Sequence, residues 1–188
     1  MFRRSNPQTV TRTKDAVLTA LFAALIAAGA FIRIPTPLVP VTLQFAFTLL
    51  AAQTLGAKAG NAVAVYVLMG LIGLPVFTEG GGIMYVLKPS FGYLIGMVAG
   101  TYICGFITER HNGKLLFRIL ASLAALVTVD LLGVSYMYLI MKYYLKARIS
   151  LSAVIISGAL IFLPTDLTWS ALTAFFAFKL KKSRAINR

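Results

Sequence analysis

The stretch LSAVIISGALIFLPTDLTWSALTAFFAF, residues 151–178, is mostly apolar and contains a single charged side chain, Asp166. A helix that crosses a membrane needs about 20 mostly apolar residues, and this stretch is longer. Pro164 stands two residues before Asp166. Because proline lacks an N–H and collides with the preceding turn, it predicts a kink or break beside the acid. A carboxylate in hydrocarbon is costly and usually functional, so the stretch predicts a polar pocket at membrane depth.

The rest of the chain has a similar composition. Of its 188 residues, 59% are hydrophobic and 12% are charged, and the mean hydropathy is +0.86. Soluble domains have about 25% charged residues. The composition therefore excludes an ordinary soluble domain and predicts an all-α, polytopic membrane protein. The basic N-terminal segment leads into the first apolar run without a small-residue cleavage motif, so we expect the first helix to be retained.

Six apolar segments qualify as spans, and we expect them to form one membrane domain over residues 16–180. They are residues 16–32, 41–55, 59–77, 91–107, 115–141 and 151–178. Basic tails, residues 1–15 and 181–188, flank this domain. An even number of spans places both termini on the same side of the membrane.

The basic residues predict which side this is. Thirteen of the 18 Lys and Arg residues fall on the side of the termini, and five fall on the other side: Arg33, Lys88, Lys142, Lys146 and Arg148. Because cytoplasmic segments carry the excess of Lys and Arg, both termini are predicted to be cytoplasmic in a multi-pass plasma-membrane protein, although residues 142–148 oppose the rule locally. The basic residues that give the chain its net charge of +13 lie at the ends of apolar spans. Membrane insertion and anionic lipids produce this pattern, so we expect no nucleic-acid binding.

Two outer loops have an unusual composition. Residues 34–42 contain three prolines, which fix φ and suppress helix, yet they are apolar enough to pack against the helices. Residues 74–82 end in three glycines, which tolerate positive φ and allow close approach of the backbone to a ligand. We predict that both loops cap the pocket; the alternative is that they are plain connectors.

The first span carries a stripe of small residues. Ala16, Ala20, Ala24 and Ala28 recur at every fourth position. Helices in lipid associate through close packing, for which small side chains at this spacing are suited. The stripe fits either packing within the chain or docking of a partner subunit, and the spacing alone does not separate the two.

The sequence lacks the common catalytic and metal-binding motifs. There is no G-x-x-x-x-G-K-[ST] loop for ATP phosphates. The single histidine, His111, lies in an inner loop and the single cysteine, Cys104, lies in an apolar run, so neither has the companions that a metal or nucleophilic site needs. We therefore expect no enzymatic activity and no cofactor. For Asp130, the second acid inside a span, we expect a structural pairing with a basic or hydroxyl group.

Several motifs occur in an order that resembles a known family. They are Arg33-Ile34-Pro35, Val39-Pro40-Val41-Thr42-Leu43-Gln44, GLIGLPVF at 70–77, Gly80-Gly81-Gly82, KPSFGYLIG at 88–96 and LPTD at 163–166. Together they resemble the BioY family, the biotin-specific substrate-binding (S) components of energy-coupling factor (ECF) transporters. The resemblance implies six helices, a vitamin pocket under the first and third outer loops, and no ATPase activity of the chain itself. It also implies three partners, a membrane coupling (T) subunit and two ATPases, with docking on the coupling subunit through the alanine stripe.

Biotin, the ligand that the resemblance implies, has a ureido ring with two N–H donors and one carbonyl acceptor. Asp166 can accept from the donors and Thr42 or Gln44 can donate to the carbonyl, in bonds that are stronger where water is excluded. The apolar ring and chain suit aromatic and thioether side chains. The candidate ligand-binding residues are Thr42, Gln44, Phe77, Gly81, Met84, Lys88, Tyr93, Asp166 and Trp169.

The chain departs from the family pattern at one charged position. Members usually carry a lysine three residues after the aspartate, and Trp169 stands there in this sequence. Lys88 is the first candidate for the missing positive charge and Arg33 is the second. The change leaves open a biotin relative, such as dethiobiotin or lipoate, as the ligand. The alternative mechanism is a secondary carrier that couples transport to protonation of Asp130 or Asp166.

Overall fold

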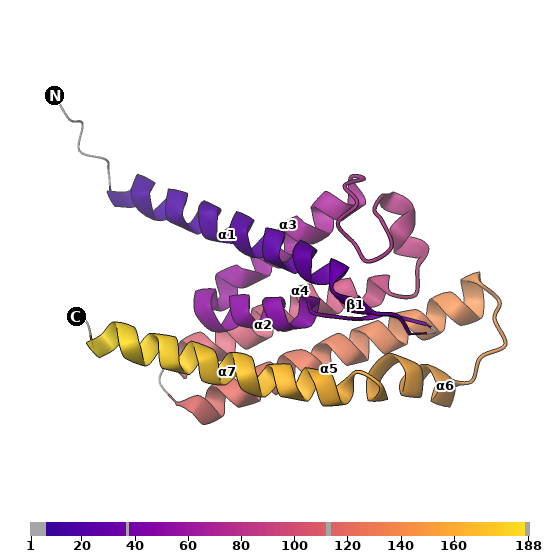
Figure 1. Ribbon diagram of the computed structural model, residues 1–188. Coiled ribbons are helices and arrows are strands. Elements are labelled where there is room, and N and C mark those ends of the chain that lie inside the picture. The colour runs from indigo at the N-terminus through magenta and orange to yellow at the C-terminus, as the bar shows by residue number, and fades with distance from the viewer. Residues whose placement is uncertain (1–6, 37, 112–113, 187–188) are drawn as a thin grey trace.

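The computed structural model describes residues 7–36, 38–111 and 114–186, which form a bundle of helices (Figure 1). In chain order the elements are α1 (Pro7–Phe31), β1 (Arg33–Ile34), β2 (Val41–Thr42), α2 (Gln44–Leu55), a 3₁₀ turn (Gly56–Lys58), α3 (Ala59–Leu71), a second 3₁₀ turn (Ile83–Leu87), α4 (Phe91–Arg110), α5 (Leu115–Leu139) with a π-helical end (Ile140–Tyr144), α6 (Leu151–Ile155) with a π-helical continuation (Ile156–Leu160), and α7 (Leu163–Ile186). The predicted all-α class is confirmed.

Within the described residues, five segments are long and apolar enough to cross a membrane. They are Thr11–Phe31, Gln44–Leu71, Phe91–Arg110, Leu115–Tyr144 and Leu151–Lys181. The second segment contains two helices, because the chain reverses direction at the turn between α2 and α3 (Figure 1). With 12 and 13 residues these helices are each about 18–20 Å long, short of the roughly 30 Å hydrocarbon layer. The bundle therefore has six helical passes, two of them short.

Both ends of the described chain lie at the same end of the bundle. Figure 1 shows the start of α1 and the end of α7 at one end, with the connection between α5 and α6 at the other. Helix α1 begins at Pro7 and α7 continues to Ile186, so both helices extend into the segments predicted to be tails. Arg3, Arg4 and Arg188 of those tails lie outside the described residues.

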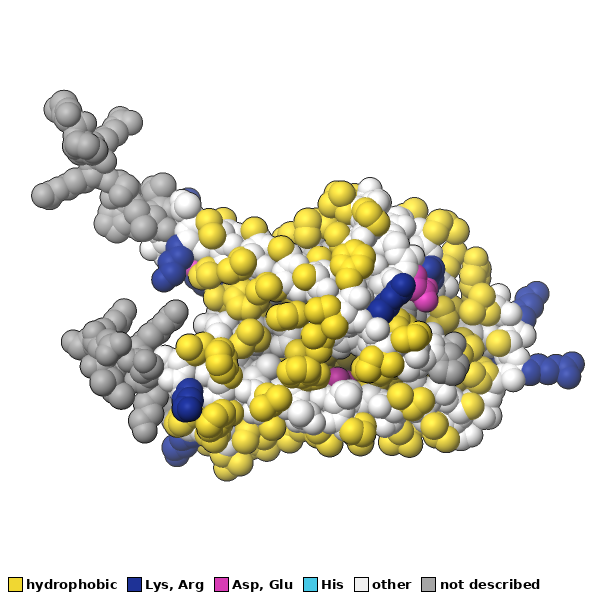
Figure 2. All heavy atoms as spheres, in the orientation of Figure 1, with side chains coloured by type: hydrophobic (Ala, Val, Ile, Leu, Met, Phe, Trp, Pro, Cys, Tyr) yellow, Lys and Arg dark blue, Asp and Glu magenta, His cyan; other side chains and the backbone are white. Residues whose placement is uncertain are grey.

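Hydrophobic side chains cover much of the lateral surface, as Figure 2 shows for one face. Leu68, Val127 and Leu131 are 60%, 64% and 66% exposed. A soluble monomer rarely displays so extensive an apolar surface, whereas lipid tails solvate it without penalty. The surface is that of a protein embedded in a bilayer.

Helices α4 and α5 touch through a row of glycines. Gly92, Gly96 and Gly100 recur every fourth residue on the side of α4 that faces α5. A Cβ atom at Gly96 would lie 2.8 Å from the Cα of Val129, and one at Gly100 would lie 2.9 Å from the carbonyl oxygen of Ala125. Side chains at these positions would collide with backbone, so the glycines allow the close helix contact that dispersion forces stabilise in lipid.

The last pass is broken where Pro164 predicts a break. The π-helical segment Ile156–Leu160 ends in a turn, in which the N–H of Phe162 donates to the carbonyl of Ala159 at 3.0 Å. Helix α7 then begins at Leu163, so Pro164 occupies its first turn, where a missing N–H leaves no helical bond unmade. Asp166 consequently lies in the first turn of a new helix.

A buried polar cluster joins α2, α4 and α5 near the end of the bundle that holds the termini. Arg118 is only 3% exposed, and its Nη1 donates to the backbone oxygen of Gln53 at 3.0 Å and to its Oε1 at 2.9 Å. The Nε2 of Gln53 donates to the carbonyl of Arg118 at 2.8 Å and to Ser122 Oγ at 2.9 Å. The count of basic residues assigned Arg118, which lies within the predicted span 115–141, to the side of the termini. The structure buries it as a hydrogen-bonded link between α2 and α5.

Replacing Arg118 by leucine is expected to destabilise the protein by about 1–3 kcal/mol, because it leaves the buried amide of Gln53 with unpaired polar atoms. Thermal unfolding in detergent, followed by circular dichroism, measures the loss. The control is Lys114→Leu, which removes an exposed cation just before α5. Equal melting temperatures for Arg118→Leu and the control would show that the cluster does not stabilise the bundle.

Candidate ligand pocket

The first outer loop folds back over the bundle as a short hairpin. Strands β1 and β2 pair antiparallel, with Arg33 opposite Thr42 and Ile34 opposite Val41. Between them the hydroxyl of Thr36 donates to the carbonyl of Val39, and the side chain of Val39 is buried. Pro37 lies outside the described residues. The proline-rich loop thus closes over the helices as a cap.

The loop between α3 and α4 forms a second cap. The N–H of Phe77 donates to the carbonyl of Gly80 at 2.9 Å, and the N–H of Gly82 donates to the carbonyl of Gly70 at 2.7 Å. Gly80 and Gly82 have φ of 105° and 104°, which favour glycine. A Cβ at Gly70 would lie 2.0 Å from the ring of Phe77, so this glycine makes room for a fully buried aromatic side chain.

The two caps meet at the rim, where Nη1 of Arg33 donates to the carbonyl oxygen of Thr78. Lys88 pairs with Glu79 within the second cap, with Nζ 2.7 Å from Oε2. Arg33 is exposed on β1, and the side chain of Lys88 is 38% exposed.

Beneath the caps is a cavity with about 620 Å³ of space, its open mouth included. Every helix except α1 and α6 contributes to the wall. The lining residues are Val39, Pro40, Val41, Thr42, Gln44, Phe45, Tyr66, Phe77, Thr78, Tyr85, Ser90, Tyr93, Leu94, Met97, Val129, Asp130, Phe162 and Asp166.

Hydrogen bonds hold most polar side chains of the wall in place. The Nε2 of Gln44 donates to the hydroxyl of Tyr66 at 2.6 Å, and Oε1 of Gln44 accepts from Thr42 at 3.2 Å. The hydroxyl of Tyr93 donates to the carbonyl of Gly158, 2.7 Å away in the π-helical segment before α7. The ring of Tyr93 also packs near Phe162, with the centroids 6.2 Å apart. Six of the 18 lining residues are aromatic, and these hydrogen bonds fix several polar side chains among them.

Five of the nine candidate ligand-binding residues line this one cavity. They are Thr42, Gln44, Phe77, Tyr93 and Asp166, which come from the first cap, α2, the second cap, α4 and α7. Residues more than 100 positions apart in the sequence thus meet at one site. Their contacts with a ligand remain predictions.

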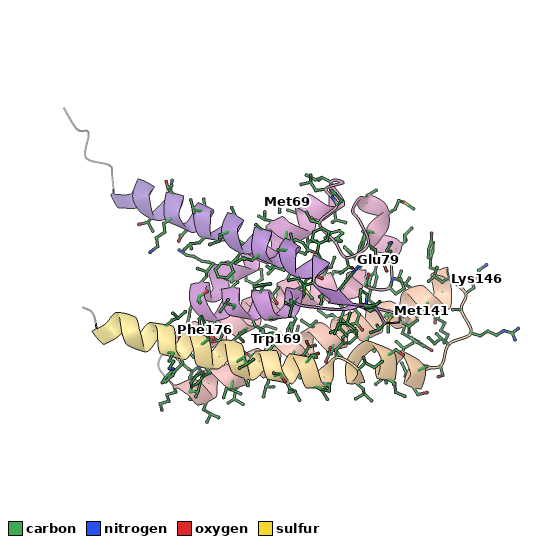
Figure 3. The ribbon with its side chains drawn as sticks, viewed as in Figure 1. Met69, Glu79, Met141, Lys146, Trp169 and Phe176 are labelled. Atoms are coloured by element: carbon green, nitrogen blue, oxygen red, sulfur yellow. The ribbon has the colours of Figure 1, made fainter. Side chains whose placement is uncertain are left out.

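The other four candidates lie outside the cavity wall. Met84 is 67% exposed, and Lys88 is held by Glu79 with its Nζ 5.1 Å from the ring centroid of Tyr85. Gly81 is pressed against the backbone, since a Cβ there would lie 2.1 Å from the carbonyl oxygen of Leu74. Trp169 lines a separate apolar groove between α2 and α7, on the side of α7 that also carries Phe176 (Figure 3).

Helix geometry explains the position of Trp169. A residue three positions after Asp166 is rotated by about 60° around the helix axis. Helix α7 packs against both α5 and α2, so this rotation is sufficient to direct one side chain to the cavity and the other to the groove beside α2. The substitution of tryptophan for the family's lysine thus adds no side chain to the cavity wall.

Asp130, Tyr66 and Tyr85 line the cavity but were not among the candidates. Asp130 was expected to have a basic or hydroxyl partner, and no such partner occurs among the described residues. The sequence did contain a signal for Asp130, because an acid near the middle of a span is itself unusual. No comparable signal marks Tyr66 and Tyr85, since tyrosine is common in membrane helices and loops.

Comparison with known proteins agrees with this architecture. The sequence model of the BioY family matches residues 4–186. The chain is 41% identical to the probable biotin transporter BioY of Lysinibacillus sphaericus over 172 residues, covering 90% of this chain and 88% of that protein. It is 34% identical to the biotin transporter BioY of Thermotoga maritima over 171 residues, covering 90% and 96%.

A crystal structure with the same fold is also known. It is the S-component for biotin from an ECF-type ABC transporter, which superposes with a TM-score of 0.78 at 28% identity, over 96% of this chain and 95% of that one. The family model spans nearly the whole sequence. On these grounds the chain belongs to the BioY family.

Proposed function

We propose that this chain is the membrane-embedded S component that captures biotin for an ECF transporter. The observation that carries the proposal is the capped cavity, in which the carboxylate of Asp166 shares the wall beneath the two loops with six aromatic side chains. A bicyclic ligand with a ureido ring matches such a wall, because its apolar faces pack on aromatic rings while its N–H groups need acceptors. The names of the relatives and of the matching crystal structure support the same ligand.

Titration calorimetry of the detergent-purified protein tests the ligand. We expect tight binding of biotin at about one molecule per chain, and weaker binding of lipoate, which has no ureido ring. Dethiobiotin keeps the ureido ring but lacks the sulfur-containing ring. Its affinity relative to that of biotin therefore gives the contribution of the sulfur-containing ring to binding. A flat titration with biotin, together with binding of lipoate or dethiobiotin, would assign the pocket to a biotin relative.

The membrane topology of the proposal has both termini in the cytoplasm of a plasma-membrane protein. The start of α1 and the end of α7 share one end of the bundle, and the predicted spans assign 13 of the 18 Lys and Arg residues to the side of the termini. The positive-inside rule then assigns this end to the cytoplasm and the capped pocket to the outside. Vitamin capture from outside requires this orientation.

Transport in this proposal is powered by partners, a membrane coupling (T) subunit and two ATPases, and the chain itself is not an enzyme. The alanine stripe supports docking on the coupling subunit, because Ala16, Ala20, Ala24 and Ala28 are all exposed on α1. The opposite side of α1 packs inward through Phe22 and other buried residues. Internal packing therefore does not account for the stripe.

Replacing Ala24 by tryptophan is expected to abolish biotin uptake in cells that carry the coupling subunit and ATPases, while binding by the purified protein stays unchanged. The bulky ring prevents the close helix approach that small residues permit. Val127→Trp, on an equally lipid-exposed part of α5, is the matched control and should transport normally. Normal uptake by Ala24→Trp would exclude the stripe from the docking surface.

A second candidate is a self-contained, proton-coupled carrier. Asp130 and Asp166 share one cavity, which favours it, because intramembrane carboxylates often carry protons in secondary transporters. Uptake in a host without any coupling subunit or ATPase, abolished when the proton gradient is collapsed, would support this carrier. Absence of uptake in that host would support the ECF assignment.

A further inference from the structure

Asp130 lies in the middle of α5 and faces the same cavity as Asp166 of α7, the neighbouring helix. The described residues offer neither carboxylate a hydrogen-bond donor or an ion-pair partner. Among the described residues that line the cavity there is also no lysine or arginine. The wall therefore presents two carboxylates to which none of the described side chains donates a hydrogen bond.

The other polar side chains of the wall are already engaged. Gln44 is bonded to Tyr66 and Thr42, Tyr93 to a backbone carbonyl, and the hydroxyls of Thr78 and Tyr85 lie 2.9 Å apart. A partly buried carboxylate without a partner is unfavourable by comparison with one that accepts a hydrogen bond. A ligand that brings two N–H donors would satisfy both carboxylates.

The chemistry of a five-membered cyclic urea matches this arrangement. Its two N–H bonds diverge to opposite sides of the carbonyl group, so a single carboxylate does not reach both. Two carboxylates on adjacent helices can each accept one bond, and charge-assisted bonds of this kind are among the stronger ones in proteins.

The cations near the cavity lie at its rim. Arg33 binds the carbonyl of Thr78 there, and Lys88 pairs with Glu79. The site thus has acids on its wall and cations at its outer edge. A ligand with donors at one end and an acid at the other has the complementary polarity.

Building on the proposed function, we propose that Asp130 is a second ligand-binding residue, which accepts one ureido N–H of biotin while Asp166 accepts the other. The two bonds fix the ring between α5 and α7 and direct the carboxylate of the ligand toward the cationic rim. Asp130 then determines specificity for a cyclic urea.

The test compares biotin with 2-iminobiotin, in which a guanidinium cation replaces the urea when protonated. Affinities are measured for wild type, Asp130→Asn and Asp166→Asn at a pH that keeps the guanidinium charged. Each substitution removes a negative charge, so each is expected to lower the affinity for 2-iminobiotin by a factor at least about 10 times larger than the factor for biotin. Asp15→Asn, which removes an exposed carboxylate on α1, is the control and should leave the ratio unchanged.

The ratio separates binding from folding, because a merely structural role for Asp130 would lower both affinities equally. If the ratio changes in Asp166→Asn but not in Asp130→Asn, the proposal for Asp130 is overturned. Should Asp130→Asn fail to fold, infrared difference spectra decide instead, recorded with and without biotin on Asp166→Asn protein whose aspartate carboxylates carry a 13C label that separates their bands from the carboxylate of biotin. A remaining ligand-induced shift of a carboxylate band supports Asp130, and its absence overturns the proposal. Failure of wild type to bind biotin would overturn the proposed function itself.

Discussion

Asp166→Asn is expected to weaken biotin binding by about 2–3 kcal/mol, or roughly 30- to 150-fold in Kd. Asparagine has nearly the same shape, so the cavity keeps its form while the acceptor loses its charge. The bond from a ureido N–H to a neutral amide oxygen is weaker than one to a carboxylate, above all where water is excluded. Titration calorimetry on the purified variant measures the change.

The charge-matched control for this variant is Asp15→Asn. Asp15 forms an exposed ion pair with Lys58, 2.6 Å from Oδ2 to Nζ, far from the cavity, and exposed pairs contribute little to stability. Its affinity for biotin should equal that of wild type. Wild-type affinity in Asp166→Asn as well would mean that Asp166 serves the structure of α7 and not the ligand.

Gly96→Leu is expected to have the largest effect on folding. Its Cβ would start 2.8 Å from the Cα of Val129, and the obstacle is backbone, which cannot rotate away. Overpacking usually costs roughly 1–3 kcal/mol, and a collision with backbone belongs at or above the upper end of that range. We expect little monodisperse protein in size-exclusion chromatography and a lower melting temperature for what remains.

The control is Ile95→Phe, the neighbouring position on α4, where the side chain is exposed on the lateral surface. It adds volume on the same helix without touching α5, so it should leave yield and melting temperature nearly unchanged. If Gly96→Leu behaved like this control, α4 and α5 would have to separate without loss of stability, and the glycine row would not govern their packing.

Several features of the molecule could be predicted from local sequence. The apolar runs fixed the helical class, and Pro164 marked the break before Asp166, because a proline cannot continue the helix in the usual way. The prolines and glycines of the two outer loops indicated caps, and both loops do close over the cavity. Each of these features depends on the backbone preferences of a few neighbouring residues.

The rotation of each helix was far harder to predict. In a soluble protein the polar face of a helix reveals its outward side, but in lipid the outward and inward faces are both apolar. Trp169 was therefore expected at the cavity and lies in a groove beside α2, and Met84 was expected there and is exposed. The same ambiguity hid Asp130 as a cavity residue.

Sequence alone thus determined the helical membrane class, the break at Pro164 and the two loops that form the caps. Hydrophobicity and the stiffness of the backbone are local properties, so neighbouring residues suffice to predict these features. Only the tertiary structure decided that α3 ends at Leu71, that glycines of α4 touch α5, and that Asp130 and Asp166 share one cavity. These depend on which faces of the helices meet, and that is settled by packing between residues distant in the sequence.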